Sequence, residues 1–362
     1  RKYTVKDVYP IAHELTHLVY VFAKPDTKTG KAVLQDPYGD VGANYEFSKS
    51  VGGNFADLQE LKKKFPHLKI LLSLGGGKYN KRFLDIADAG KLRTLANSMV
   101  DLLDQFEYEY ENPETGKKGS HCFHYHGLFD GIDLDWEFGS GDKAEKYAQQ
   151  WLEFIQEMHH VLHKKKKHAV LTVDIEVNPK VYTQLPLTQA INFVDWYNVM
   201  AYDFYSPRND SVGLNAPICG TYSVYSIDGA LYRLMDLGIS PEKMVLALPL
   251  YGHVYTNANG FLTQYKKDED AKPVMYYHLQ KKFLQNPKFE KKWHPSGQVP
   301  SAYNAKEKVF VSYDDHESLK LKVEHGCQKH VKGYAVWRLS GDDEYNSLLK
   351  EIIRARNSCI AR

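Results

Sequence analysis

The sequence has no run of about 18 apolar residues, the length that a membrane-spanning helix needs, so we expect no membrane-embedded segment. It also has no excess of one charge, since 47 Lys and Arg face 45 Asp and Glu, for a net charge of +2. This balance gives no electrostatic attraction for nucleic acid. What remains is a globular protein of 362 residues, long enough to bury a large hydrophobic core.

Cysteine is scarce, and its four residues are Cys122, Cys219, Cys327 and Cys359. Their spacings match no zinc-binding pattern. An even number permits disulfide bonds, but a chain of this length does not need them, so free buried thiols stay an equal alternative. The sequence opens at Arg1 with neither Met nor a recognisable signal peptide, so we expect a processed or trimmed chain.

A row of carboxylates is the most informative feature of the sequence. Residues 129–137 read Phe-Asp-Gly-Ile-Asp-Leu-Asp-Trp-Glu, with Asp133, Asp135 and Glu137 at every second position. In a strand these three side chains share one face, and the apolar residues between them share the other. Carboxylates this close repel one another, so at least one should keep a proton near neutral pH. A protonated carboxyl is what general acid catalysis requires.

Three interpretations of this row compete. Carboxylates at the end of a strand can bind Mg²⁺ or Ca²⁺. The row could also be an exposed edge strand with polar spacing, although Phe129 and Trp136 favour burial. The third interpretation is a glycosidase acid with supporting carboxylates, and the rest of the chain favours it.

Predicted strands alternate with predicted helices along most of the chain, which indicates an α/β fold with a parallel sheet. Seven strands are expected over residues 16–23, 68–77, 129–137, 169–177, 193–204, 243–252 and 333–340. Helices are expected over residues 54–64, 91–108, 147–162, 228–238 and 344–353. The alternation is interrupted between residues 254 and 332, where short aromatic strands predominate.

The segment Asp130–Glu137 resembles the DxxDxDxE signature of glycoside hydrolase family 18, the chitinases and their relatives. The resemblance extends to Thr-His-Leu-Val-Tyr-Val-Phe-Ala at residues 16–23, Ser-Leu-Gly-Gly at 73–76 and Met-Ala-Tyr-Asp-Phe at 200–204. It implies a (β/α)8 TIM barrel, formed by residues 1–253 and 333–362, with catalytic groups at the carboxyl ends of the strands. Residues 254–332 would form a small α+β insertion domain.

The sequence departs from the family pattern in three places. The family's first strand is absent, and we expect it to precede Arg1. Gly77 stands where the family has Trp, with Tyr79 as the nearest aromatic residue. The family's Tyr-Gly-Arg is Tyr251-Gly252-His253 here.

The resemblance implies a chitinase that hydrolyses β-1,4 linkages of chitin or GlcNAc oligosaccharides, using the substrate's own acetamido group as nucleophile. Glu137 would be the general acid and then the base. Asp135 would bond the acetamido N–H and share a proton with Asp133, and Tyr202 would hold the acetamido oxygen. Asp130 would brace the backbone. The implied substrate-binding residues are Asp203, Met200, Trp337, Phe22, Tyr251 and Tyr79.

The resemblance also implies a secreted monomer that needs neither a metal nor another cofactor and binds neither nucleic acid nor membrane. Two alternatives stay open. An endo-β-N-acetylglucosaminidase acting on N-glycans generally lacks an insertion such as residues 254–332. A chitin-binding lectin of the same fold usually loses the acid, whereas Glu137 is present here.

Overall fold

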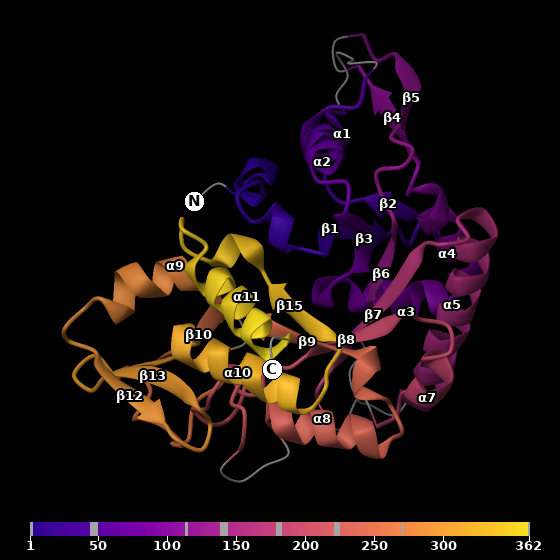
Figure 1. The fold of residues 1–362 in the computed structure, drawn as a ribbon. Coiled ribbons are helices and arrows are strands. Elements are labelled where there is room, and N and C mark those ends of the chain that lie inside the picture. Colours follow the sequence, from indigo (N-terminus) through magenta and orange to yellow (C-terminus); the bar gives the residue numbers. More distant parts are fainter. Residues whose placement is uncertain are drawn as a thin grey trace. The chain divides into compact units, whose positions relative to one another are not determined.

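The computed structural model describes residues 3–43, 50–112, 115–137, 144–178, 183–220, 225–268 and 271–360. The chain divides into two compact units (Figure 1). The first unit comprises Arg1–Asp174 and Gln184–Asp195, and the second comprises Ile175–Thr183 and Trp196–Arg362.

The first unit is built on a parallel sheet, as the alternation of strands and helices predicts. Two 3₁₀ turns, Val5–Val8 and Ala12–Glu14, precede its first strand. The parallel strands, in their order across the sheet, are β7 (Val170–Glu176), β6 (Gly131–Asp135), β3 (Lys69–Gly75) and β1 (His17–Pro25). A short strand, β2 (Ala32–Leu34), pairs antiparallel with the end of β1.

Helices connect these strands and bury their apolar faces. The helices are α1 (Pro37–Val41), α2 (Gly53–Lys64), α3 (Asn80–Asp88), α4 (Leu92–Asp101), α5 (Ala144–Lys165) and α7 (Leu187–Ala190). On α5 the apolar residues Trp151, Ile155, Met158 and Leu162, which recur at helical spacing, are each at most 2 % exposed, whereas Tyr147 at the start of the same row is half-buried. Figure 1 shows α4 and α5 side by side.

The helix predicted over residues 91–108 is wrong at its carboxyl end. The helix α4 ends at Asp101, and Gln105–Glu111 is strand β4, paired antiparallel with β5 (Lys118–His124). Its side chains alternate with a period of two, because Phe106, Tyr108 and Tyr110 are half-buried while the residues between them are exposed. The strand forms because the side chains of β4 pack against those of β5 across the pair. Figure 1 shows the two strands as a projecting hairpin.

The second unit contains three parallel strands and a separate antiparallel sheet. The parallel strands, in sheet order, are β8 (Trp196–Met200), β9 (Met244–Pro249) and β15 (Gly333–Trp337). The antiparallel sheet has the order β11 (Val274–Met275), β10 (Tyr251–Thr256), β14 (Val309–Ser312), β13 (Val299–Asn304) and β12 (Glu290–His294). The helical segments are α8 (Ile227–Asp236), α9 (Tyr276–Leu279), η5 (Gln280–Leu284), α10 (His316–Gln328) and α11 (Ser347–Ile360).

The single strand predicted over residues 243–252 is in fact two strands in different sheets. β9 ends at Pro249 and β10 begins at Tyr251. The Leu250 N–H still donates to the Trp337 carbonyl, whereas the Leu250 carbonyl accepts from the Tyr276 N–H. The chain therefore changes sheets at Leu250, a switch that a continuous apolar run does not reveal. The predicted domain division at residues 254 and 332 stays a prediction.

A disulfide bond joins two helices of the second unit. Cys327 on α10 and Cys359 on α11 are bonded, with their Cα atoms 6.3 Å apart. Cys122 and Cys219 are free thiols. The sequence left disulfides and free thiols open, and the structure contains both. The pairing depends on α10 packing against α11, which spacing alone does not specify.

We expect reduction of this disulfide to lower stability, because the bond closes a loop of 32 residues in the unfolded chain. Loop-closure entropy gives about 3–4 kcal/mol for a loop of this size. Thermal unfolding would be compared with and without a reductant, and with the Cys327→Ser/Cys359→Ser variant. Cys219→Ser is the control, since Cys219 is an exposed free thiol. Equal melting temperatures for the double variant and the control would contradict the expectation.

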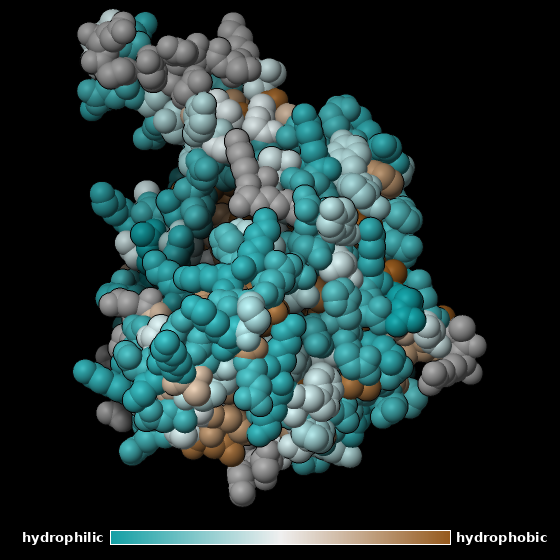
Figure 2. Space-filling model, turned by 90° about the vertical axis from the view of Figure 1, so that its left-hand side faces the viewer, coloured by the Kyte–Doolittle hydropathy of each residue, from teal (hydrophilic) through white to brown (hydrophobic). Residues whose placement is uncertain are grey.

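The surface in Figure 2 is mainly hydrophilic, with hydrophobic residues in small, separate areas. Within the described ranges, no helix is both long and apolar enough to cross a lipid bilayer.

Candidate active site

Asp133 and Asp135 of the carboxylate row lie on β6, the strand between β3 and β7 in the first unit. The strand is shorter than the predicted range 129–137, so Glu137 lies just beyond its carboxyl end. Ser73 on β3 and Thr172 on β7 are the register partners of Asp133. The Ser73 hydroxyl donates to Asp133 Oδ2 at 2.7 Å, and the Thr172 hydroxyl donates to Asp133 Oδ1 at 2.5 Å. All three residues are buried. Each oxygen of the Asp133 carboxyl therefore accepts a hydrogen bond from a neighbouring strand, which fixes this group in place.

Asp135, the middle carboxyl of the row, is 5 % exposed. Burial raises the pKa of Asp135 well above its usual range, and the charges of Asp174, Glu137 and Asp133 and a hydrogen bond to Glu137 raise it further. Its Oδ1 atom is buried without a hydrogen-bond partner among the described residues. The raised pKa favours the protonated form of Asp135, which can donate a hydrogen bond to Glu137.

The sequence predicted that Asp135 would share its proton with Asp133. In the structure Asp135 is hydrogen-bonded to Glu137, and the charge of Asp133 also raises the pKa of Asp135. Both Asp133 oxygens accept hydroxyl hydrogen bonds from Ser73 and Thr172. The predicted sharing of a proton between Asp135 and Asp133 stays a prediction.

Glu137 ends the row and is half-buried. A glycine segment after β3 runs alongside it, and a Cβ atom built on Gly77 would lie 3.1 Å from Glu137 Oε2. On the preceding residue, Gly76, a Cβ would lie 3.0 Å from the ring of Phe22 on β1. The lack of side chains in this segment thus leaves room for the Glu137 carboxyl and the Phe22 ring.

Gly75 makes the closest of these backbone approaches. Its φ of +133° is unfavourable for other residues, and a Cβ there would lie 2.0 Å from the Asp135 carbonyl oxygen. We expect Gly75→Ala to destabilise the fold by at least about 2 kcal/mol through overpacking and backbone strain. The control is Gly90→Ala, since Gly90 also has a positive φ (+67°) but no atom within 4 Å of a built Cβ.

Urea unfolding of the two variants measures this difference. A Gly75→Ala protein as stable as Gly90→Ala would show that β3 and β6 can separate at this point without cost.

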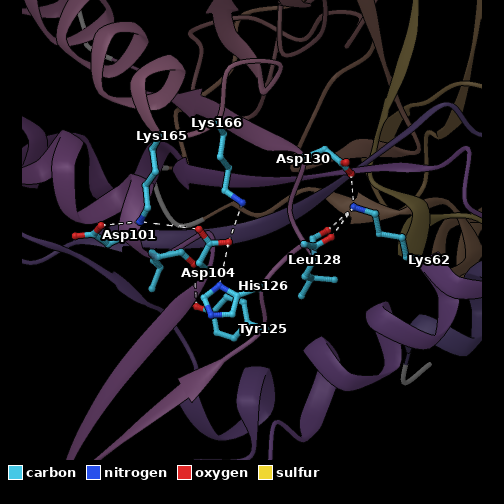
Figure 3. Close-up of polar contacts among 11 residues, drawn as sticks. Lys62, Asp101, Asp104, Tyr125, His126, Leu128, Asp130, Lys165 and Lys166 are labelled. Carbon is cyan, nitrogen blue, oxygen red and sulfur yellow. Dashed lines mark hydrogen bonds and ion pairs between the residues drawn. The ribbon is translucent and has the colours of Figure 1, made fainter.

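The other side chains of the motif hold β6 in place. Trp136 is 3 % exposed and stacks on Phe83 with ring centroids 4.9 Å apart. Asp130, before the strand, accepts from the Ile70 N–H at 2.8 Å and from Lys62 Nζ at 2.6 Å (Figure 3). Lys62 also donates to the Leu128 carbonyl. The predicted bracing contact of Asp130 with the backbone is thus present in the structure.

In the second unit, predicted binding residues gather around Asp203, just beyond β8. The backbone of Asp203 is left-handed, with φ of 56°, and its N–H donates to Asn215 Oδ1 at 2.9 Å. Asp203 Oδ1 accepts from the Tyr251 hydroxyl at 2.6 Å and lies 2.8 Å from His253 Nε2. Tyr202 packs edge-on against Tyr251, with ring centroids 5.8 Å apart.

The electrostatics of Asp203 follow from these contacts. The side chain of Asp203 is 54 % exposed. Partial desolvation by its neighbours raises the pKa of this carboxyl, but the hydrogen bond and charge of His253 and the Tyr251 hydroxyl outweigh that effect and hold the pKa below its usual range. Asp203 therefore stays ionised, with one oxygen engaged by two buried side chains. His253, which replaces the arginine expected from the family pattern, thus contacts Asp203 directly.

The remaining predicted residues lie at strand ends or beside the glycine segment. Met200 ends β8, and Trp337 ends β15, where its register partner is Pro249 on β9. Tyr79 is 6 % exposed, and its hydroxyl donates to Gln35 Oε1 at 3.0 Å. In the first unit the structure brings together Asp133, Asp135 and Glu137, and in the second Tyr202, Asp203 and Tyr251. The roles proposed for all the predicted site residues stay predictions.

The sequence analysis missed several residues that shape these groups. Ser73, Thr172 and Asp174 flank the carboxylate row, and Asn215 anchors Asp203. A signal was available for the residues on β7, because strand alternation places Thr172 and Asp174 on one face. That this face borders the carboxylate row depends on the register between β6 and β7, which the sequence does not specify.

Comparison with known proteins finds relatives that are named as chitinases. Chitinase A1 of Niallia circulans is 27% identical over 94% of this chain and 54% of its own length. Probable chitinase 2 of Drosophila melanogaster is 26% identical over 91% of this chain and 66% of its own length. The chain thus spans less than two thirds of the length of these curated relatives.

Solved structures show the same fold. A chitinase from Bacillus thuringiensis superimposes with a TM-score of 0.78 at 25% identity, covering 97% of this chain and 67% of that one. A Group IV chitinase of Ostrinia furnacalis, solved in complex with allosamidin, gives a TM-score of 0.79 at 23% identity, covering 99% and 94%. The predicted fold class is confirmed: a mixed α/β fold with parallel strands and a further small sheet.

The family model described as glycosyl hydrolases family 18 matches residues 2–342. This match includes the complete carboxylate row, its flanking strands and the residues around Asp203. The chain belongs to glycosyl hydrolases family 18.

Proposed function

We propose that this protein is a chitinase that hydrolyses β-1,4 linkages of chitin or GlcNAc oligosaccharides with retention of anomeric configuration. The observation that carries the proposal is that the three carboxyl groups of the row have different surroundings. Asp133 is fixed by two hydroxyls, Asp135 is buried with a raised pKa, and half-buried Glu137 is hydrogen-bonded to Asp135. A glycosidase acid needs such a proton held beside a carboxyl that can reach the leaving oxygen.

In the proposed reaction, the proton of Asp135 passes along its hydrogen bond to Glu137, and Glu137 transfers it to the glycosidic oxygen as the C–O bond breaks, which leaves Asp135 as an anion. The acetamido carbonyl oxygen of the substrate bonds to the anomeric carbon and forms an oxazolinium ion, so no carboxylate nucleophile is required. Glu137 then takes a proton from water as that water opens the ring, which restores the acetamido group and the protonated acid.

Asp135 would orient the acetamido N–H and stabilise the positive charge that develops on this group. The Oδ1 atom of Asp135 is a buried acceptor without a partner among the described residues, so it can accept the hydrogen bond of the acetamido N–H. After its proton has passed to Glu137, Asp135 is an anion that can stabilise the positive charge. Tyr202 would donate to the acetamido oxygen. The substrate-binding residues proposed are Asp203, Met200, Trp337, Phe22, Tyr251 and Tyr79.

We also propose that the protein acts outside the cell as a monomer and needs no metal. Its Cys327–Cys359 disulfide is typical of an oxidising compartment. Residues 254–332 would form the insertion domain, which argues against an endo-β-N-acetylglucosaminidase of N-glycans.

Turnover of a fluorogenic chitobioside tests the activity, and a high-mannose glycopeptide serves as the competing substrate. Hydrolysis of the chitobioside supports the proposal. Cleavage of the glycopeptide alone would favour the N-glycan enzyme. Binding of chito-oligosaccharide without hydrolysis at any pH would identify a lectin.

A further inference from the structure

A fourth carboxylate lies beside the row, on the neighbouring strand β7. Thr172 is level with Asp133 in the parallel register, and its hydroxyl bonds to that carboxyl, so the side chain of Thr172 faces the row. Asp174 follows two residues later and therefore has the same facing. Continuing the register from Leu134 and Val173 places Asp174 level with Asp135.

The strand on the other side of Asp135 contributes no side chain at this level. The register partner of Asp135 on β3 is Gly75, and a Cβ there would lie 2.0 Å from the Asp135 carbonyl oxygen. Among the described residues of the two flanking strands, Asp174 is thus the side chain that β3 and β7 supply at the level of Asp135. At the level of Asp133, by contrast, both flanking strands supply hydroxyl donors.

The charges that face Asp135 can therefore be named by element. Asp133 comes from its own strand, Glu137 lies just beyond the end of that strand, Asp174 comes from β7, and Gly75 of β3 contributes none. After burial, the charge of Asp174 has the largest effect in raising the pKa of Asp135, ahead of Glu137 and Asp133. A like charge disfavours the ionised form, so Asp174 favours the protonated form of its neighbour.

We propose that Asp174 is a positioning residue, whose negative charge keeps the shared proton on the Asp135–Glu137 pair and thereby extends the activity of the acid to higher pH. This inference rests on the proposed glycosidase function. It gives Asp174 no contact with the substrate, and its effect is transmitted through Asp135. The two coupled carboxyls lose their proton as a unit, so the pH–rate profile reports on the pair.

The test compares Asp174→Asn, which removes the charge at constant size, with Asp174→Glu, which keeps it. The pH dependence of kcat/KM would be measured on fluorogenic chitobioside. Removing a like charge lowers the pH at which the pair loses its proton, so the high-pH limb for Asp174→Asn should move down by about one pH unit. The limb for Asp174→Glu should stay near that of the wild type, and the low-pH optimum should keep most of its rate.

A second measurement does not depend on turnover. Carboxyl ¹³C NMR titration would follow the Asp135 resonance in the wild type and in Asp174→Asn, with Asp135→Asn used for assignment. The midpoint should fall in the variant. If the wild type hydrolyses nothing, the proposed function fails, while this titration still decides what Asp174 does.

An unchanged high-pH limb together with an unchanged Asp135 midpoint would overturn the inference. Equal loss of activity at every pH without a moved limb would also overturn it, because that result describes a structural residue. Asp174→Ser is the second neutral variant should Asp174→Asn not fold, and it should move the limb in the same direction.

Discussion

Replacing Glu137 with Gln is expected to reduce chitobioside turnover by about 10²–10⁴-fold or more while leaving folding and oligosaccharide binding nearly intact. The amide keeps the size of the side chain but cannot donate a proton to the leaving oxygen. It can still accept the hydrogen bond from Asp135, so the local structure should persist. The effect should therefore appear in kcat, with little change in the affinity for chito-oligosaccharide.

Steady-state kinetics and calorimetric binding of a chito-oligosaccharide measure these two quantities separately. Glu109→Gln is the matched control, because Glu109 is an exposed residue of β4 that the proposed mechanism does not use. Activity of Glu137→Gln within tenfold of the wild type would remove Glu137 from its proposed role.

Replacing Asp135 with Asn should also cost about 10²-fold or more in kcat. The Asn amide can still donate to Glu137, but it cannot become an anion when positive charge develops on the acetamido group. Asp85→Asn is the control, since Asp85 forms an exposed ion pair with Lys81 on α3. A kcat similar to that of the wild type would show that Asp135 holds Glu137 only by a hydrogen bond.

Asp135→Asn is expected to lose activity but to gain stability relative to the wild type as the pH rises. The pKa of Asp135 is raised in the folded state, by burial first and then by neighbouring carboxylates. The unfolded chain loses this proton near pH 4, so the folded wild type loses stability as pH rises from there toward the higher folded pKa. Asn does not titrate, and the variant should therefore become more stable relative to the wild type across this range.

Melting temperatures of both proteins from pH 4 to pH 8 test this linkage. The difference should grow with pH in favour of Asp135→Asn. A constant difference would mean that Asp135 has its ordinary pKa in the folded protein.

The carboxylate row could be predicted from the sequence because strand geometry is local. Alternation with a period of two places Asp133, Asp135 and Glu137 on one face of an extended segment regardless of the rest of the chain, although β6 itself ends at Asp135. The same reasoning separated Asp130 from the row. For residues 105–108 the sequence analysis extended the preceding helix instead, and the structure shows a strand with a period of two that pairs with β5.

The electrostatic order of the row could not be predicted from one strand. Which carboxyl keeps a proton depends on what the neighbouring strands supply: hydroxyls from Ser73 and Thr172 at Asp133, and a carboxylate from Asp174 at Asp135. These contacts join residues far apart in the chain, with a separation of 60 between Ser73 and Asp133 and of 39 between Thr172 and Asp133. Their pairing is set by parallel register.

The sequence by itself determined the family signature, the alternation of strands and helices, and the face of β6 that carries the acids, because each depends on residues close together in the chain. The tertiary structure decided which carboxyl has the raised pKa, which cysteines are bonded and where the chain changes sheets at Leu250. Those properties depend on burial and on contacts between distant segments, and burial and charge energies are properties of the packed molecule.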